Sequence, residues 1–145
     1  MGKNIPLLAL LLPLSLPGCS GPATAPTVHI HSTASCGCCG DWVQQLRASG
    51  FEVEVEQAYD IRPHARYLGV PEQFQTCYVA NIEGTFLQGE VPPADIKRVR
   101  SEFPDAAGLA VRSISRNRPT AGDHPGDTLL FERSGRVSVF AHHHE

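Results

Sequence analysis

A run of three cysteines within four residues constrains this chain more than any other stretch. Residues 36–39 read Cys-Gly-Cys-Cys between Ser35 and Gly40, and the glycines allow the backbone to turn tightly around the thiols. A pattern typical of a helix begins directly behind them at Asp41, and a further thiol, Cys77, precedes another apolar run. We expect the fold to bring Cys77 back to the other three thiols.

Length and composition indicate a single globular domain. The chain has 145 residues, of which 41% are hydrophobic and 19% charged, as is usual for soluble globular proteins. The formal net charge is -3, and the sequence contains no block of lysines and arginines. A nucleic-acid-binding protein would carry a clustered basic face, so we expect no nucleic acid among the partners.

The first 18 residues have the features of a secretory signal. Lys3 precedes an apolar stretch, residues 5–16, that prolines interrupt and that is too short to span a membrane. The following Leu16-Pro17-Gly18-Cys19 resembles the bacterial lipoprotein signal, in which the cysteine becomes the lipidated first residue. We therefore expect a signal peptide at 1–18, lipidation at Cys19, a tether at 19–26 and a folded domain at 27–142. The alternative is an ordinary signal cleaved near residues 23–25.

The residue after the lipidated cysteine bears on location. An aspartate at that position would retain a lipoprotein at the inner membrane, and this chain has Ser20 instead. We expect a protein that is anchored by lipid in the outer membrane and faces the periplasm, with the membrane as a partner through that anchor.

The pattern of apolar residues predicts an α/β fold. Strands are expected at 28–31, 51–56, 76–82 and 86–91, and helices after the cysteine loop, between Asp60 and Gly69, and from Pro93 onward with Phe103 on the buried face. A long loop at 112–127 and a hairpin of strands 127–132 and 136–140 follow, and His142 to His144 trail off it. The order β-α-β-α-β-β-α with a C-terminal β-hairpin is that of a thioredoxin-like domain, in which the cysteine loop and Cys77 would be neighbours.

With Cys19 lipidated, four cysteines remain, and their clustering suits some chemistries better than others. Disulfides that stabilise a fold close long loops, whereas three of these thiols crowd one turn. A thiolate at the N-terminus of a helix is stabilised by unpaired backbone N–H groups and the helix dipole. Such thiolates serve soft-metal binding or thiol–disulfide exchange, and purely structural cysteines are the third alternative.

The metal interpretation favours Cu(I), with Cys36, Cys38, Cys39, Cys77 and His31 as candidate ligands. Thiolates select Cu(I) and zinc, and the adjacent Cys38 and Cys39 suit two-coordinate or bridged copper sites better than one mononuclear site. Zinc also fits, because the four thiols can supply its tetrahedral shell. The redox interpretation uses Cys36 and Cys39 as a C-x-x-C pair ahead of a helix.

At this point the sequence resembles a known family. The stretches 33–43 and 46–53, the Cys77 strand, 91–96 and 104–111 are similar to periplasmic metal-binding proteins called CopG-like, many of which carry only a domain-of-unknown-function label. The resemblance covers roughly residues 27–142 and implies a thioredoxin-like fold and a part in copper handling and resistance. Where the family usually has histidines this chain has Tyr78 and Glu90, and its only methionine is Met1, so a more purely thiolate site is implied.

We therefore expect a periplasm-facing protein that binds copper for sequestration, transfer or resistance, with a periplasmic copper-handling protein as a partner. The alternative is an enzyme, a thiol–disulfide or copper oxidoreductase. His31, five residues before Cys36, is the histidine expected to reach the site, and His124 and the three C-terminal histidines stay open as ligands. We interpret His64 as a helix-surface residue.

Overall fold

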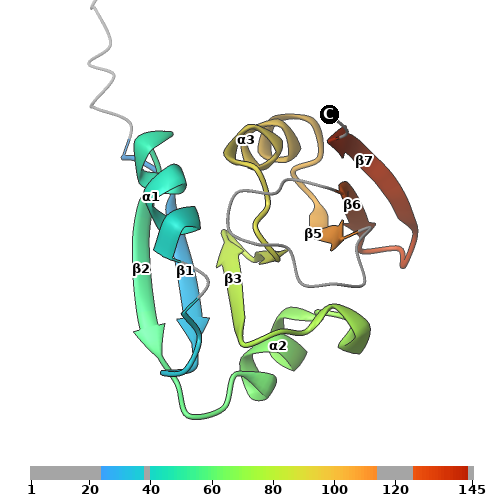
Figure 1. Ribbon diagram of the computed structural model, residues 1–145. Helices are drawn as coiled ribbons and strands as arrows, with labels where there is room; N and C mark the ends of the chain where they lie inside the picture. Colours follow the sequence, from blue (N-terminus) through green and yellow to red (C-terminus); the bar gives the residue numbers. More distant parts are fainter. Residues whose placement is uncertain (1–23, 38–39, 114–125, 144–145) are drawn as a thin grey trace, which may run out of the picture.

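A computed structural model describes residues 24–37, 40–113 and 126–143, which form a mixed α/β fold (Figure 1). The α/β class expected from the sequence is thereby confirmed. The elements follow one another as β1 (Thr27–Ser32), α1 (Gly40–Ala48), β2 (Glu52–Gln57), α2 (Arg62–Leu68), the 3-10 helix η1 (Glu72–Phe74), β3 (Tyr78–Ile82), β4 (Thr85–Gln88), α3 (Pro93–Glu102), β5 (Ala106–Ser113), β6 (Gly126–Glu132) and β7 (Val137–His143).

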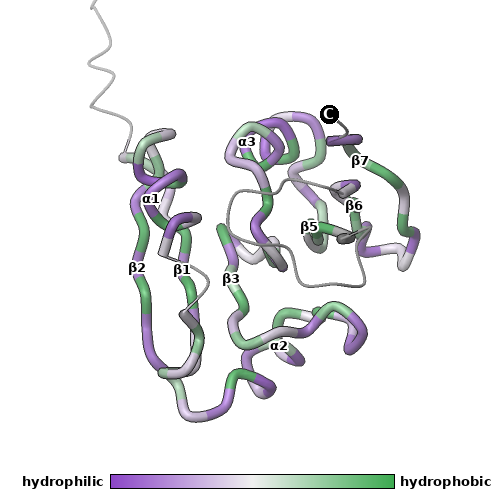
Figure 2. The backbone as a smooth tube through the Cα atoms, in the orientation of Figure 1, coloured by the Kyte–Doolittle hydropathy of each residue, from purple (hydrophilic) through white to green (hydrophobic). Residues whose placement is uncertain are grey.

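All seven strands of the described residues join one sheet in the order β2-β1-β3-β4-β5-β6-β7. β1 runs parallel to β2 and antiparallel to β3, and β4 runs parallel to β5. The remaining neighbours are antiparallel. Because β2 and β7 stand at the two ends of the strand order, they are the edge strands. Hydropathy alternates along β2 because its valines alternate with glutamates (Figure 2).

The sheet is covered on both faces, and each face has its own core. Side chains of α1 and α3, such as Trp42 and Ile96, belong to one cluster with Ile30 of β1. Ala65 of α2 belongs to a second cluster, with Val79 of β3. Neighbouring residues of one strand point to opposite faces. β1 and β3 therefore send side chains alternately to the α1–α3 side of the sheet and to the α2 side.

Glycines end two of the helical segments as the sequence indicates. Gly50 follows α1 with φ 92°, and Gly69 caps α2 in the left-handed conformation with φ 77°. A residue with a Cβ is strained there. The helix expected between Asp60 and Gly69 has Ile61 at its N-cap, and Asp60 Oδ1 accepts a 3.0 Å hydrogen bond from the Arg62 backbone N–H.

A buried hydrogen bond joins α1 to the segment before α3, and a close packing contact joins β5 to β4. Trp42 is fully buried and its indole N–H donates to the carbonyl of Val91 at 2.8 Å. Gly108 of β5 lies directly under the Phe86 ring, so closely that a Cβ there would overlap the ring. Phe86 and Gly108 are partners in the β4–β5 register, so this pairing leaves no room for a side chain at residue 108.

Three expectations for individual segments are wrong. Residues 106–113 form β5, so the loop expected from Arg112 does not include Arg112 and Ser113, which pair with the first residues of β6. Phe103 is 41% exposed, since it follows the last turn of α3. His142 and His143 belong to β7, which extends beyond residue 140 by pairing with β6.

The predicted signal peptide, Cys19, most of the tether, Cys38, Cys39, His124 and His144 lie outside the described residues. Among the helices that are described, none is long and apolar enough to cross a membrane.

Candidate metal centre

Cys77 meets the cysteine loop, as the sequence predicts. It forms a disulfide with Cys36, and the two Cα atoms are 5.6 Å apart, a spacing usual for bridged cysteines. Cys36 lies in the loop between β1 and α1, and Cys77 directly precedes β3. Both are half-buried and pack against the core on the α1–α3 side of the sheet.

Thr33, just after β1, ties the two cysteine segments together. Its backbone N–H donates to the Cys77 carbonyl at 3.0 Å, and its hydroxyl lies 3.4 Å from the same oxygen. Its own carbonyl accepts the N–H of Cys36 at 3.0 Å. These hydrogen bonds link the backbones of the two cysteine segments in addition to the disulfide.

The loop leads straight into α1, whose first described residue is Gly40. Trp42, Val43 and Leu46 point into the core on the face that the sequence predicts. Cys38 and Cys39 are outside the described residues, so their placement at the N-terminus of this helix stays a prediction. A thiolate at that position would be stabilised by the helix N-terminus.

His31 lies on the other face of the sheet. It is directly opposite Val79 in the β1–β3 register, and Val79 belongs to the core on the α2 side. Cys36 and Cys77 pack on the α1–α3 side. Among the described residues, the structure thus brings two of the predicted ligands together and places His31 apart from them.

On that second face His31 stacks on His64 of α2. The ring centroids are 4.0 Å apart and the planes are inclined by 15°. His31 Nδ1 is buried without a hydrogen-bond partner, and Glu56 Oε2 is 3.5 Å away without the geometry of a hydrogen bond. Burial lowers the pKa of His31 below 6.5, and His64 lowers it further, whereas Glu56 acts in the opposite direction. The neutral imidazole is therefore favoured.

The C-terminal histidines that are described have carboxylate partners. His142 Nδ1 lies 2.7 Å from Asp127 Oδ1. His143 Nε2 lies 2.7 Å from Asp95 Oδ2, which also accepts the hydroxyl of Thr128 at 2.7 Å. Asp95 stands in the first turn of α3, so these contacts attach the end of β7 to that helix, and Figure 1 shows the two side by side.

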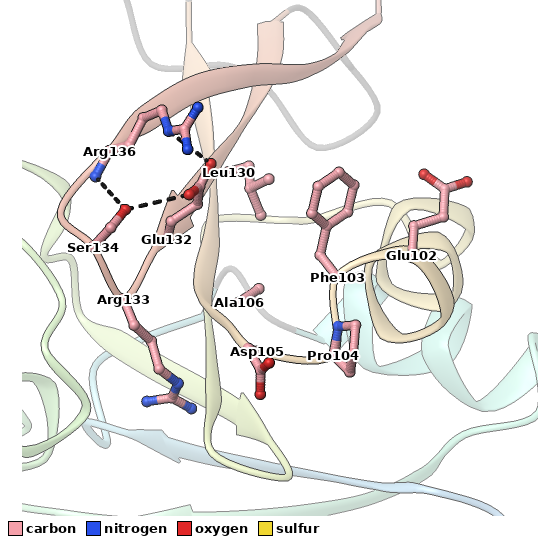
Figure 3. A pocket seen from close by; sticks show the side chains of 10 residues that line it. All are labelled: Glu102, Phe103, Pro104, Asp105, Ala106, Leu130, Glu132, Arg133, Ser134 and Arg136. Atoms are coloured by element: carbon pink, nitrogen blue, oxygen red, sulfur yellow. Dashed lines mark hydrogen bonds and ion pairs between the residues drawn. The ribbon is translucent and has the colours of Figure 1, made fainter.

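Within residues 24–37, 40–113 and 126–143 there is no group of three or more histidine, cysteine or acidic side chains placed to hold a metal ion. A pocket of about 590 Å³ lies between the end of α3 and the β6–β7 turn (Figure 3). Its lining contains no cysteine and no histidine, and Glu132, Ser134 and Arg136 bond to one another along one wall. This pocket is therefore separate from the candidate metal centre.

Comparison with known proteins places the chain in a family. Residues 74–119 match the family described as "Protein of unknown function, DUF411". A solved structure named "Copper resistance protein copG", Form 2, is 33% identical, with a TM-score of 0.72, over 83% of this chain and 99% of the other. The chain belongs to the CopG-like family. Form 1 of that protein is 31% identical, with a TM-score of 0.69, over 82% of this chain and 98% of the other. No curated protein matches the chain significantly.

Tyr78 and Glu90 stand where the sequence resemblance implies histidines in this CopG-like family. Tyr78, next to Cys77, is buried, and its ring centroid is 5.8 Å from that of Trp42. Glu90 is half-buried between β4 and α3. Tyr78 thus contributes to the packing between α1 and the sheet.

Sequence reasoning missed one side chain of this CopG-like chain that contacts a candidate ligand. His64 follows Pro63 in α2 and lies three residues after Ile61 and four before Leu68, a spacing that places it on the same side of the helix as these two core residues. Its contact with His31 joins residues far apart in the sequence, so only the folded structure shows it. The helical spacing of His64 with Ile61 and Leu68 is the local signal that could have placed it near the sheet.

Proposed function

We propose that this protein binds copper as Cu(I) through the thiolates of Cys36, Cys38, Cys39 and Cys77, and that it sequesters the metal or passes it on. The observation that carries the proposal is the position of Cys77. It is 41 residues from Cys36 in sequence, yet their Cα atoms are 5.6 Å apart. A distant sulfur is thus delivered to a loop that holds two more thiols. The resemblance to a copper resistance protein supports copper as the metal.

Metal binding by all four thiols requires the reduced protein. Opening the Cys36–Cys77 disulfide takes up two electrons and two protons and gives two thiols. Each thiol then releases its proton when it binds the metal, because the thiolate is the ligand. Thiolates favour Cu(I) and also bind zinc, for which four of them complete a tetrahedral shell.

An anaerobic competition titration of the reduced protein with a Cu(I) chelator, together with metal analysis, tests the proposal. We expect tight Cu(I) binding that Cys77→Ser weakens by at least about tenfold, since even groups outside the ligand shell are often worth that much. Ser35→Ala is the matched control, because Ser35 is exposed in the same loop and carries no thiol. Unchanged affinity in Cys77→Ser, or zinc that displaces Cu(I) at equal concentration, would contradict the proposal.

The role of His31 is tested separately. We assign the copper site to the thiolates and leave His31 with His64, because the sheet lies between His31 and the Cys36–Cys77 pair. His31→Leu should therefore change Cu(I) affinity by less than about threefold, as expected for independent sites. A larger loss in the same titration would return His31 to the ligand set.

A second candidate function is thiol–disulfide exchange, and the disulfide itself favours it. The bonded pair is Cys36 and Cys77, so the exchange would use these two residues in place of the Cys36–Cys39 pair that the C-x-x-C spacing suggests. An oxidoreductase should reduce a model disulfide without metal, and its Cys36 and Cys77 should become oxidised as two electrons pass to the substrate. Thiol-specific labelling of the metal-free protein before and after the reaction distinguishes this enzyme from a metal carrier.

We also infer that the first seven regular elements, with η1 set aside, form a thioredoxin-like unit. They follow the order β-α-β-α-β-β-α, and their strands lie as β2-β1-β3-β4 with β1 and β2 parallel. In this arrangement the loop after β1 and the start of β3 are adjacent, as Thr33 and Cys77 are. The proposal accounts for the meeting of the two cysteine segments.

For location, we propose lipidation at Cys19 and attachment to the outer membrane on the periplasmic side, where a copper-handling protein would be the partner. The motif before Cys19 and the serine after it support this. Cys19→Ser should move the protein from the membrane fraction to the soluble periplasmic fraction. If the variant stays with the membrane, the anchor is elsewhere.

A further inference from the structure

A buried amide lies against the segment that carries Cys77. Gln88, the last residue of β4, is only 2% exposed. Its Nε2 donates to the hydroxyl of Thr76 at 2.8 Å and to the carbonyl of Tyr78 at 3.1 Å. These two residues flank Cys77, so Gln88 bonds to the side chain of the residue before Cys77 and to the backbone of the residue after it.

The same short segment has further hydrogen bonds. The hydroxyl of Thr76 donates to the carbonyl of Tyr78 at 3.2 Å, which closes the turn around Cys77. The carbonyl of Cys77 itself accepts the N–H of Thr33 at 3.0 Å. Thr33, just after β1, therefore holds Cys77 through its carbonyl, and Gln88 holds the residues on either side of it.

Gln88 is an unfavourable choice if its role is only to fill space. Its Oε1 is buried without a hydrogen-bond partner, and an unpartnered buried acceptor destabilises a fold. An apolar side chain of similar size would fill the position without that cost. The two bonds that Nε2 makes to the Cys77 segment are what an apolar side chain cannot supply.

We propose that Gln88 is a positioning residue that holds Cys77 within bonding reach of Cys36. The metal-binding meaning of this inference rests on the proposed function, but its effect on the disulfide does not. A segment ordered in advance loses less conformational entropy when its sulfur bonds to a partner. Gln88 thus favours the joining of the Cys36 and Cys77 sulfurs, directly in the disulfide or through a shared metal.

The glutathione equilibrium of the metal-free protein measures this preference directly. Oxidised glutathione takes two electrons and two protons from the thiols of Cys36 and Cys77, which yields the protein disulfide and two molecules of reduced glutathione. Cys77 is the only cysteine between Arg66 and Lys97, and no lysine or arginine lies between these two residues. A tryptic digest after alkylation therefore reports the free and disulfide-linked fractions of Cys77 on one peptide.

The test compares Gln88→Met with Gln75→Met. Gln75 is half-buried in the same segment, and its side chain donates a hydrogen bond to the Val70 carbonyl at 3.1 Å. Unlike Gln88, its side chain is not hydrogen-bonded to Thr76 or Tyr78. Gln88→Met should lower the equilibrium constant for the Cys36–Cys77 disulfide by roughly tenfold, which is the scale of one to two net hydrogen bonds. Gln75→Met should leave it within about twofold.

Thr76→Val tests the same hydrogen bond by a second variant, which can be used if Gln88→Met does not fold. Thr76 is exposed, and the change removes the hydroxyl that accepts from Gln88. It should shift the equilibrium in the same direction, and the double variant should lose less than the sum of the two single changes because the residues share one bond. Equal equilibrium constants for folded Gln88→Met, Thr76→Val and wild type would overturn the inference.

The outcomes separate this inference from the copper proposal. A wild-type protein that fails to bind Cu(I) refutes the proposed function and leaves the glutathione result standing. A Gln88→Met protein with an unchanged glutathione equilibrium refutes the positioning role, even if Cu(I) binds tightly. If both proposals hold, Gln88→Met also lowers Cu(I) affinity and Gln75→Met does not.

Discussion

Asp60 and Arg62 show how a single exposed pair sets an ionisation constant. The guanidinium of Arg62 donates to both carboxylate oxygens of Asp60, at 2.8 to 3.0 Å, and its backbone N–H adds a further bond. These side-chain hydrogen bonds, followed by the backbone one, lower the pKa of Asp60 to about 2. Because Asp60 precedes the first residue of α2, its carboxylate also favours the start of that helix.

The first prediction concerns this carboxyl group. Arg62→Met should raise the pKa of Asp60 from about 2 toward its ordinary value of 3.8, because it removes the side-chain donors. A depressed pKa in the folded state adds stability above pH 3.8, and that stability is lost as pH falls through about 2. The shift is read from the side-chain carboxyl carbon by NMR titration, with Arg66→Met as the control. An unchanged titration in Arg62→Met would contradict the assignment.

At the residue scale, the sequence predicts the reactive groups of the site better than it predicts which side chains touch one another. The crowded cysteines and the return of Cys77 follow from residue types and apolar patterns. The stacking of His31 on His64 does not, because it depends on how α2 lies against the sheet. Val55 shares one side of β2 with Val53, yet it is 47% exposed, because the core cluster that includes Val53 does not extend to it.

At the scale of elements, the contact between β4 and β5 tolerates no side chain at residue 108. Gly108 lies under the ring of Phe86, and a Cβ would overlap that ring. Phe86 is only 1% exposed, so it has little room to move. The two strands can therefore pair at this distance only while residue 108 lacks a side chain.

We predict that Gly108→Ala destabilises the protein by about 1–3 kcal/mol, the usual result of overpacking a closed core. Gly40→Ala is the matched control, since Gly40 begins α1 and a Cβ there meets nothing within 4 Å. Urea unfolding of both variants gives the difference. If Gly108→Ala is as stable as Gly40→Ala, the Phe86 ring does not pack on residue 108 in solution.

The elements that the sequence did not predict have physical reasons. β5 begins Ala-Ala-Gly, which lacks the alternation and the branched side chains of a strand. It forms because β4 and β6 supply partners on both sides. β7 runs past its expected end because His142 and His143 find carboxylates on β6 and α3, which no local pattern reveals.

At the scale of the whole molecule, the Cys36–Cys77 bond closes a loop of 41 residues. A crosslink over that span stabilises a fold by about 4 kcal/mol when it limits the unfolded chain without distorting the native one. The loop contains α1, β2 and α2 and ends at the start of β3. Reduction should therefore weaken the molecule as a unit and leave its arrangement intact.

We predict that the reduced protein unfolds with a free energy lower by about 2–4 kcal/mol than the oxidised protein. Guanidinium unfolding with and without reductant measures the difference. Cys77→Ser can form only short crosslinks within residues 36–39 of the loop, so most of the dependence on reductant should disappear in it. A wild-type protein that is equally stable in both buffers would show that Cys36 and Cys77 are not joined in solution.

The family resemblance could be recognised from sequence because its strongest signal, the cysteine loop, is local. The arrangement of strands could not be deduced as fully. Alternation indicates that residues 27–32 and 52–57 are strands, but it does not say that β1 lies between β2 and β3. That order depends on contacts between distant segments, such as the one from Thr33 to Cys77.

The two edge strands differ in how readily they would pair with another molecule at high protein concentration. β2 carries Glu52, Glu54 and Glu56 along an open edge, and like charges there oppose the lateral addition of a second sheet. β7 offers Val137 and Val139, 51% and 43% exposed, at the other edge. Aggregation of a concentrated sample should therefore begin at β7. Val139→Lys should reduce it, because it places a charge on that edge.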